Sequence, residues 1–411
     1  MSNGYLVTLD IGSSQVRVVV AELTKNGTFP IVGVGTAVSQ GIKKGAIVDI
    51  EQAAGAVRLA IEQAEQMVGI EITDVYVGLS GNHISIQHSH GVVATLNQDR
   101  EIEAVDVERV LQATKVIALP PERVIIEVVS KQFIVDGIPE IRDPIGMVGV
   151  RLEVDAMVIT GSKTVVHNVY RCIEKASLHM AGFVFLPLSI SEFTLTADEK
   201  NLGVVLADIG SGTIKLAFYS QGNLAGTAVI PMGGEYITTD LVYVLQTQKD
   251  VAEELKCKHG IAVKAHADKR ESIPIPMMAG KERYSSQLEL AQIMEPRIME
   301  IFQLINQQVK AMGFAAEPAG GYVLVGGVTE TPYLLEAAKS QLGQAVRIAR
   351  SKETSISSPA FLASVSMIHH LAKQGSILVN KPPRKETVPR TKEKKRPSAF
   401  QRMKNWLSEF I

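Results

Sequence analysis

One strand–turn–strand pattern occurs twice in this chain, and its repetition restricts the possible fold more than any other feature. An apolar segment leads into the tetrapeptide DIGS at 10–13, and alternating apolar residues follow it. The same order returns around DIGS at 208–211, so that each residue of the first turn has a counterpart at one constant offset. Alternation around a Gly/Ser turn predicts a β-hairpin. The sequence therefore predicts two related halves, each built on one such hairpin.

The repeated turn has the chemistry of a phosphate-binding loop. Glycine and serine leave backbone N–H groups accessible, and such a concavity binds phosphate oxygens. One such turn indicates little, because an Asp/Gly hairpin without a ligand is more common, but two copies can clamp a polyphosphate across a cleft. Asp10 and Asp208 are expected to organise Mg²⁺ through water. The predicted phosphate-binding residues are Asp10, Gly12, Ser13, Ser14, Gln15, Asp208, Gly210, Ser211, Gly212 and Thr213.

A third glycine site follows an apolar segment at 322–325. Gly326 and Gly327, with Val328 beside them, would allow a flat base to approach the backbone. The alternative is an ordinary left-handed turn before the next helix. The site is therefore a candidate for the base end of a nucleotide whose phosphates lie at the two repeated turns.

The rest of the chain mixes helix and strand patterns. Apolar periodicity predicts helices at 51–67, 164–180, 238–256 and 288–312. It predicts strands at 75–79, 125–129, 134–135, 156–160 and 322–325, and the prolines of 273–281 indicate a loop. Strands that alternate with helices are typical of an α/β protein.

Charge and cysteine content argue against several classes of function. The chain has 42 Lys and Arg against 43 Asp and Glu, so no nucleic-acid partner is expected. Cys172 and Cys257 lack the spacing of a zinc site or a disulfide framework. No signal peptide is evident, and no apolar run reaches the roughly 18 residues of a spanning helix. We expect a cytoplasmic protein whose 411 residues form two or more domains.

The last residues combine a basic linker with an amphipathic helix. Residues 377–397 are rich in Lys, Arg and Pro, which predicts a disordered linker. At about 100° per residue, the apolar side chains of 398–411 gather on one face of a helix that is too short to span a bilayer. This predicts an interfacial membrane helix; the alternative is docking on the protein's own body or on a partner. The predicted membrane-binding residues are Phe400, Arg402, Met403, Lys404, Trp406, Leu407, Phe410 and Ile411.

The three glycine loops, in this order, resemble the nucleotide site of the actin, chaperone and sugar-kinase superfamily. Glu253 and Lys256 resemble the helix with which bacterial actins hold ribose and purine, and Gly233 with Gly234 resembles the turn that begins the preceding helix. The segment 133–153 resembles the subdomain that the FtsA family of division proteins adds to the actin fold. The resemblance covers nearly the whole chain and implies an actin-like ATPase fold with a nucleotide cleft.

By this resemblance the chain divides into four subdomains and a tail. Subdomain 1A would comprise residues 1–80, 161–201 and 351–376, and subdomain 1C residues 81–160. Subdomain 2A would comprise 202–239 and 313–350, and subdomain 2B residues 240–312. The linker (377–397) and the terminal helix (398–411) would follow.

The resemblance also implies function. It implies ATP with Mg²⁺ in the cleft, filaments of copies of this chain, and binding of the FtsZ C-terminal tail by subdomain 2B. Other divisome proteins, and peripheral attachment to the cytoplasmic side of the cell membrane at the division septum, are implied as well. The candidate partner-binding residues are Arg283, Tyr284, Gln292 and Arg297, although an ordinary solvated helix face explains them equally well.

Two positions depart from the family pattern. Gln15 stands where family members commonly carry lysine. Lys215 stands where the family's second phosphate loop (loop two, residues 210–215 here) usually has an acidic residue. If Lys215 points into the cleft, it can offset the charge missing at Gln15. No residue that could orient water for hydrolysis is evident, so we expect ATP binding with at most slow hydrolysis.

Two other functions remain open at this stage. A small-molecule kinase of the same superfamily would need a substrate-facing Asp base and polar sugar contacts, and no convincing set is evident. A pilus-assembly protein of the PilM type has a similar fold and a comparable added subdomain. It generally lacks a long C-terminal tether, which argues against this alternative.

Overall fold

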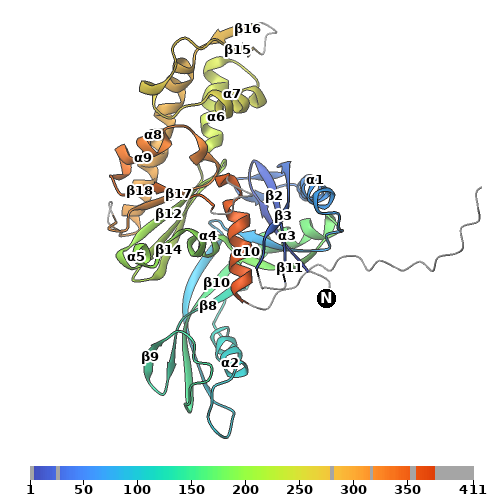
Figure 1. Cartoon of the computed structure of the whole chain (residues 1–411), viewed down its shortest axis with the longest axis vertical. Coiled ribbons are helices and arrows are strands. Elements are labelled where there is room, and N and C mark those ends of the chain that lie inside the picture. The colour runs from blue at the N-terminus through green and yellow to red at the C-terminus, as the bar shows by residue number, and fades with distance from the viewer. Residues whose placement is uncertain (1–3, 25–27, 278–281, 315–317, 352–357, 375–411) are drawn as a thin grey trace, which may run out of the picture.

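The computed structural model describes residues 4–24, 28–277, 282–314, 318–351 and 358–374, and most of these residues form two halves with related sheets (Figure 1). In the first sheet the strand order is β11 (His179–Phe185), β6 (Asp74–Leu79), β1 (Tyr5–Ile11), β2 (Gln15–Glu22) and β3 (Ile31–Val38). In the second it is β18 (Val346–Ile348), β17 (Tyr322–Val325), β12 (Val204–Ile209), β13 (Ile214–Ser220) and β14 (Asn223–Ile230).

The two sheets share one topology. β1 pairs with parallel β6 on one side and with antiparallel β2 on the other, and β12 pairs in the same way with β17 and β13. In each half the repeated DIGS turn begins at the end of the central parallel strand, where ligands of open α/β sheets bind. The prediction of an α/β fold with two related halves is therefore confirmed.

Helices cover the sheets of both halves. In the first half these are α1 (Ile50–Val68), α3 (Lys163–Lys175), α4 (Leu186–Thr194) and α10 (Leu362–Gln374), and α4 and α10 pack together between the halves (Figure 1). Asp49 caps α1 by accepting a hydrogen bond from the Gln52 N–H at 3.0 Å. Gly35 lets α1 lie close to β3, because a Cβ there would be 1.8 Å from the Ala60 carbonyl oxygen.

The second half carries α5 (Ala197–Leu202), α6 (Gly234–Leu245), α8 (Gln287–Ala311) and α9 (Leu334–Leu342). Its upper end adds α7 (Lys249–His259) and the two-stranded sheet of β15 (Ile273–Pro276) and β16 (Glu282–Ser285) (Figure 1). The apolar face of α8, from Leu290 to Val309, packs into the core of this half. Short 3₁₀ helices at Lys264–His266 and Gly327–Glu330 connect these elements, and a third at Pro359–Phe361 leads into α10.

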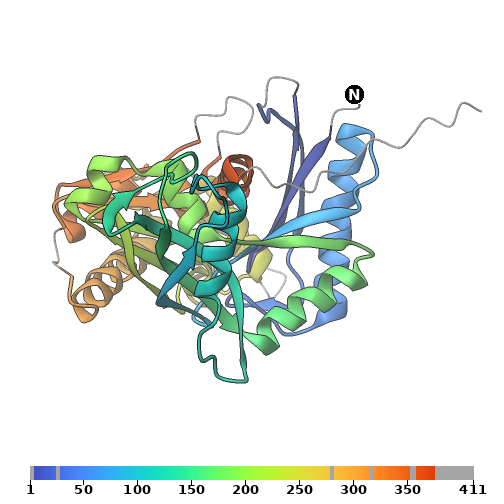
Figure 2. The ribbon, with the colours of Figure 1, turned by 90° about the horizontal axis from the view of Figure 1, so that it is seen from below.

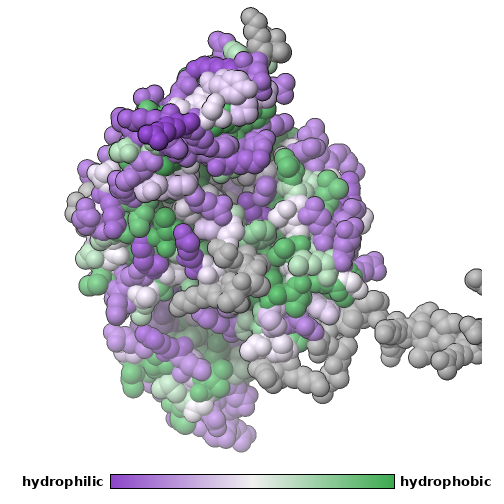
Figure 3. All heavy atoms as spheres, turned by 45° about the horizontal axis from the view of Figure 1, so that its top comes forward, coloured by the Kyte–Doolittle hydropathy of each residue, from purple (hydrophilic) through white to green (hydrophobic). Residues whose placement is uncertain are grey.

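An antiparallel arm projects from the first half, between β6 and α3 (Figures 1 and 2). Its strand order is β7 (Ile84–Ala94), β10 (Arg151–Ser162), β8 (Arg123–Val135) and β9 (Ile138–Ile141), and α2 (Ala104–Thr114) packs on one face. The arm has its own core, around Ile102, Val110 and Leu152. Apolar residues also lie exposed on it, among them Ile138 and Val148, and Figure 3 shows apolar surface at this lower end.

Three sequence predictions of elements are wrong. The helix predicted at 238–256 is two helices, because Gln246 adopts a left-handed conformation (φ 53°) that ends α6. The helix predicted at 164–180 ends at Lys175, where Ser177 (φ 63°) turns the chain into β11. The loop predicted at 273–281 contains β15, whose prolines are tolerated because, among the described residues, this strand pairs with β16 alone.

The membrane helix predicted at 398–411 and the linker predicted at 377–397 lie outside the described residues. Within the described part of the chain, no helix is long and apolar enough to cross a membrane.

Candidate functional site

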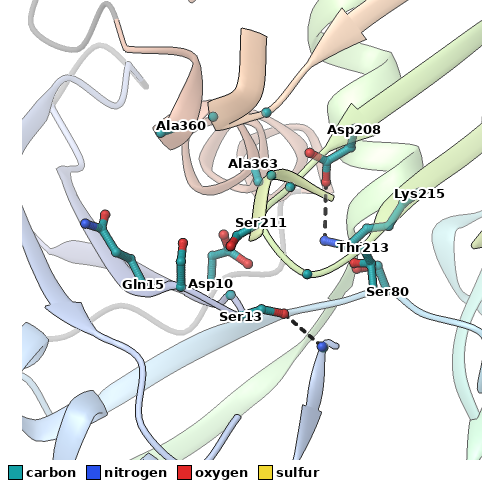
Figure 4. A pocket seen from close by; sticks show the side chains of 18 of the residues that line it. Asp10, Ser13, Gln15, Ser80, Asp208, Ser211, Thr213, Lys215, Ala360 and Ala363 are labelled. Atoms are coloured by element: carbon teal, nitrogen blue, oxygen red, sulfur yellow. Dashed lines mark hydrogen bonds and ion pairs between the residues drawn. The ribbon is translucent and has the colours of Figure 1, made fainter. Parts of the chain in front are cut away.

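A cavity of about 560 Å³ lies between the two halves and brings the predicted loops together (Figure 4). All the predicted nucleotide-binding residues except Gly233 line it. These residues come from segments far apart in the sequence: the turns after β1 and β12, the start of α6, the helix α7 and the turn after β17.

The two repeated turns, at 12–15 and 210–213, are called the phosphate-type turns below. They are closed by the same backbone hydrogen bond, and they contact each other. The Gly12 N–H donates to the Gln15 carbonyl at 3.1 Å, and the Gly210 N–H donates to the Thr213 carbonyl at 3.0 Å. A Cβ on Gly212 would lie 2.7 Å from Ser13 Oγ, so a larger residue would force the loops apart. Within the described residues, the N–H groups of Ser13, Ser14, Ser211 and Gly212 have no acceptor, so they are available to phosphate oxygens.

Neighbouring segments hold both turns in place. Ser39 Oγ donates to the Gly12 carbonyl at 2.6 Å. Ser13 Oγ accepts from the Gly45 N–H at 2.9 Å, the dashed line at Ser13 in Figure 4. Gly45 belongs to a small hairpin of β4 (Ile42–Lys43) and β5 (Ala46–Ile47). Gly233 lies behind loop two, where a Cβ would be 2.4 Å from the Gly210 carbonyl oxygen. The structure therefore places Gly233 as a support for loop two, away from the cavity.

Charged side chains surround the turns. Lys215 on β13 points toward Asp208 on the neighbouring strand, and Nζ lies 3.3 Å from Oδ2 (Figure 4). Burial alone would lower the pKa of Lys215, but the carboxylates of Asp208 and Asp10 outweigh it and raise that pKa. Burial raises the pKa of Asp10, while Lys215 and Arg17 oppose that rise. Lys215 therefore points into the cleft, where it lines the cavity.

A polar cluster around Lys256 also lines the cavity. Lys256 Nζ donates to Glu253 Oε2 at 2.6 Å, to Thr238 Oγ1 at 2.8 Å and to the Gly234 carbonyl at 3.2 Å. Burial alone would raise the pKa of Glu253, but Lys256 and the Thr238 hydroxyl hold it below its ordinary value. This cluster joins α7 to α6, and its hydroxyl, ammonium and carboxylate groups suit a ribose or a purine edge.

Removing the ammonium of this cluster should have a measurable cost. The Lys256→Met variant leaves Glu253 and Thr238 without their shared partner, so the free energy of unfolding should fall by about 1–3 kcal/mol. Lys258→Met is the matched control, because the Lys258 side chain is 64% exposed in a surface pair with Glu254. That change should cost less than about 0.5 kcal/mol. Urea denaturation measures both, and equal losses would contradict this role of Lys256.

The residues present fit a nucleotide better than they fit a divalent cation. Two turns with available N–H groups, a glycine turn at Gly326 and a polar cluster at Lys256 are spaced along one cavity. For Mg²⁺ the predicted holders are Asp10 and Asp208, and both line the cavity. Asp208 is already paired with Lys215, however, so a cation would have to displace an ion pair. Of the two aspartates, Asp10 has no ion pair among the described residues. The magnesium site stays a prediction.

Arg17 is among the residues of the cavity that the sequence interpretation missed. Arg17 lines the cavity, and its Nη2 donates to Gln15 Oε1 at 3.1 Å. The internal repeat could have identified it, because Arg17 and Lys215 occupy equivalent positions after the two DIGS turns. The hairpin register places each of them opposite the aspartate of its own turn, Arg17 opposite Asp10 and Lys215 opposite Asp208.

The predicted partner-binding residues lie on β16 and α8, away from the cavity. Tyr284 is 63% exposed, and Gln292 is exposed on α8. Arg283 pairs with Glu289, and Arg297 donates to both carboxylate oxygens of Asp240 at 2.7 and 3.0 Å. The two arginines therefore have intramolecular partners, whereas Tyr284 offers an exposed ring. Their role in partner binding stays a prediction.

Two family models match the chain. The model for the "SHS2 domain inserted in FTSA" matches residues 81–160, and the model for "Cell division protein FtsA" matches residues 205–366. The chain is 40% identical to the cell division protein FtsA of Bacillus subtilis over 92% of its length and 85% of that protein. It is 36% identical to the FtsA of Pseudomonas aeruginosa over 84% of its length and 83% of that protein.

Solved structures share the fold at low sequence identity. The PilM–PilN type IV pilus biogenesis complex matches with a TM-score of 0.59 at 15% identity, over 91% of this chain and 99% of that chain. MreB5 of Spiroplasma citri bound to ADP matches with a TM-score of 0.53 at 12% identity, over 90% and 98%. At these identities the likeness shows the actin-like fold alone.

Proposed function

The chain belongs to the FtsA family of cell division proteins, and from that premise we propose that it is an ATP-binding, filament-forming adaptor that holds FtsZ filaments at the membrane. Its role in cell division follows from family membership. The observation that carries the proposal is the pair of matched turns that face each other across one cavity. A polyphosphate that bridges both turns would fix the two halves relative to each other.

The proposed nucleotide is ATP, with its phosphates at the two turns and its base toward Gly326 and Lys256. The actin-like fold supports this, since solved structures of MreB5 from Spiroplasma citri with the same fold are bound to ADP and to AMPPNP. Hydrolysis is proposed to be slow, because Lys215 engages Asp208, a carboxylate that could otherwise help to organise the reacting groups. Rapid phosphate release from the nucleotide-saturated protein would contradict this part of the proposal.

Assembly and partner binding are assigned to the two ends of the molecule. Exposed apolar residues on the antiparallel arm, Ile138 and Val148 among them, support contacts with further copies or with other divisome proteins. The exposed Tyr284 and Gln292 on the opposite end support a contact with the FtsZ tail, with Arg283 and Arg297 beside them. Filament formation would make many weak membrane contacts act together.

Attachment to the inner face of the cell membrane is assigned to residues 398–411. The helix predicted for this segment would have an apolar face and would follow the basic residues 377–397, and such a helix binds an anionic surface reversibly. Co-sedimentation with anionic vesicles tests the whole proposal, with the full chain compared to residues 1–397. We expect the full chain to sediment and to carry an FtsZ C-terminal peptide with it. The truncated chain should stay in the supernatant and still bind ATP.

A point substitution in the tail sharpens this test. Trp406→Glu places a charge on the apolar face, so vesicle binding should fall by more than about tenfold. Ser408→Glu is the matched control, because it adds the same charge on the polar face and should weaken binding far less. Sedimentation of the Trp406→Glu protein equal to that of the unchanged protein would refute the membrane role of the helix.

A further inference from the structure

Each of the two phosphate-type turns has a basic side chain at the same place. Arg17 stands opposite Asp10 in the β1–β2 register, and Lys215 stands opposite Asp208 in the β12–β13 register. Both side chains line the cavity. The internal repeat of the chain therefore extends from the turns to a pair of cations, one in each half.

We propose that Arg17 and Lys215 are the built-in counter-charges of the nucleotide's polyphosphate, and that they let this protein bind ATP without a divalent cation. The inference rests on the proposed ATP binding and specifies how that site handles charge. In most polyphosphate sites with carboxylates, a divalent cation bridges the carboxylates and the phosphate oxygens. Here each carboxylate has a protein cation as its cross-strand neighbour.

Lys215 occupies the place where a bridging cation would have to act. Its Nζ lies 3.3 Å from Asp208 Oδ2, and the side chain is only 22% exposed. Asp10 also acts on Lys215 electrostatically, so the ammonium feels both carboxylates of the cavity. A divalent cation would have to separate Asp208 from this partner before it could bind there.

The Arg17 guanidinium lies against the first turn and has N–H donors without a partner among the described residues. Its Nη2 donates to Gln15 Oε1 at 3.1 Å, and the guanidinium lies over the Phe361 ring at 5.8 Å from the centroid. A Cβ on Gly12 would be 3.7 Å from Nη1, which shows how close the guanidinium is to the turn. Its buried Nε has no hydrogen-bond partner among the described residues. Gln15 thus acts as a positioning residue for the Arg17 guanidinium. This planar cation has several donors and suits phosphate oxygens well.

The charges explain why no further cation is required. Asp10 and Asp208 bring two negative charges to the turns, which would repel a polyphosphate if they stood alone. Lys215 is paired with Asp208, Arg17 acts electrostatically on Asp10, and Lys44 adds a cation at the tip of the β4–β5 hairpin, which also lines the cavity. The backbone N–H groups of both turns then meet phosphate oxygens in a site whose carboxylates are already balanced.

Calorimetric titration of the full chain with ATP tests the proposal, in saturating MgCl₂ and in EDTA. For the unchanged protein we expect the two dissociation constants to agree within about threefold. Lys215→Met should weaken binding about 10- to 100-fold in EDTA, because a charge-assisted contact is lost. Saturating MgCl₂ should restore much of that loss, since the cation can then occupy the vacated place beside Asp208.

Controls separate the possible failures. Lys310→Met removes the same charge from an exposed position at the end of α8 and should change neither dissociation constant. Lys215→Arg keeps the charge and should keep binding in EDTA, and thermal melts check that each variant is folded. If the unchanged protein binds ATP with MgCl₂ but loses more than about tenfold in EDTA, the inference is overturned while ATP binding stands. If no ATP binds in either buffer, the proposed function fails as well.

Discussion

Replacing Gly326 by alanine is expected to lower the free energy of unfolding by about 2–5 kcal/mol, a large part of the total for a domain. Gly326 has φ 93° and ψ 165°, a region that residues with a Cβ rarely adopt. An added Cβ would also lie 2.6 Å from Asp208 Oδ1 and 2.6 Å from the Ile209 carbonyl oxygen. The clash therefore falls on the turn that carries the second DIGS motif, so ATP binding should be lost together with stability.

The adjacent glycine provides the matched control for this prediction. A Cβ on Gly327 would meet nothing closer than Ala360 Cβ at 4.0 Å, and no left-handed backbone angle is involved. Gly327→Ala should therefore change the free energy of unfolding by less than about 1 kcal/mol. Urea denaturation of the two variants measures the difference. Equal stabilities would mean that the turn after β17 can relax away from Asp208, which would contradict the packing argument.

The phosphate-type turns could be predicted from the sequence because their signal is local and repeated. Each turn is closed by a hydrogen bond between residues three apart, from Gly12 to Gln15 and from Gly210 to Thr213, and the DIGS tetrapeptide occurs in both halves. The placement of Lys215 could not be predicted, because the side chains of a strand alternate between two faces. Only the register with Asp208 decides which face meets the cavity.

Two of the wrongly predicted elements depend on features that the local pattern of apolar residues does not show. The break between α6 and α7 depends on a left-handed Gln246, and glutamine carries no local signal for that conformation. The strand β15 depends on its partner β16 (Glu282–Ser285), which lies outside the segment 273–281. Pairing with a neighbouring strand thus overrode local propensity at β15.

A buried histidine links the antiparallel arm to the helices between the halves. His370 on α10 is 5% exposed, with Nδ1 3.0 Å from Glu192 Oε2 on α4 and Nε2 3.2 Å from Glu127 Oε1 on β8. Burial alone would lower the pKa of His370, but hydrogen bonds and charge from both carboxylates raise it to about 9. Lys373 and Lys200 also act electrostatically on Glu192, and Lys373 Nζ lies 4.0 Å from Glu192 Oε2. The imidazolium therefore joins two elements of the first half to the root of the arm.

This arrangement predicts a stability that falls at alkaline pH. The folded pKa of His370 lies above the unfolded value, so its contribution is fully present below the unfolded pKa and is lost as the pH rises through about 9. Linkage predicts a loss on the order of 2 kcal/mol in the free energy of unfolding between pH 7 and pH 9. His370→Gln should flatten this slope, whereas His179→Gln, which alters an exposed pair with Asp74, should keep it. Urea denaturation at several pH values gives the slopes, and a slope in His370→Gln as steep as in the unchanged protein would place the titrating group elsewhere.

Because Glu127 lies on β8, the strand that continues into the arm, loss of the His370 charge should loosen the root of the arm before the sheets unfold. Hydrogen exchange should then increase first in β8 and α10, where the imidazolium holds the two carboxylates together.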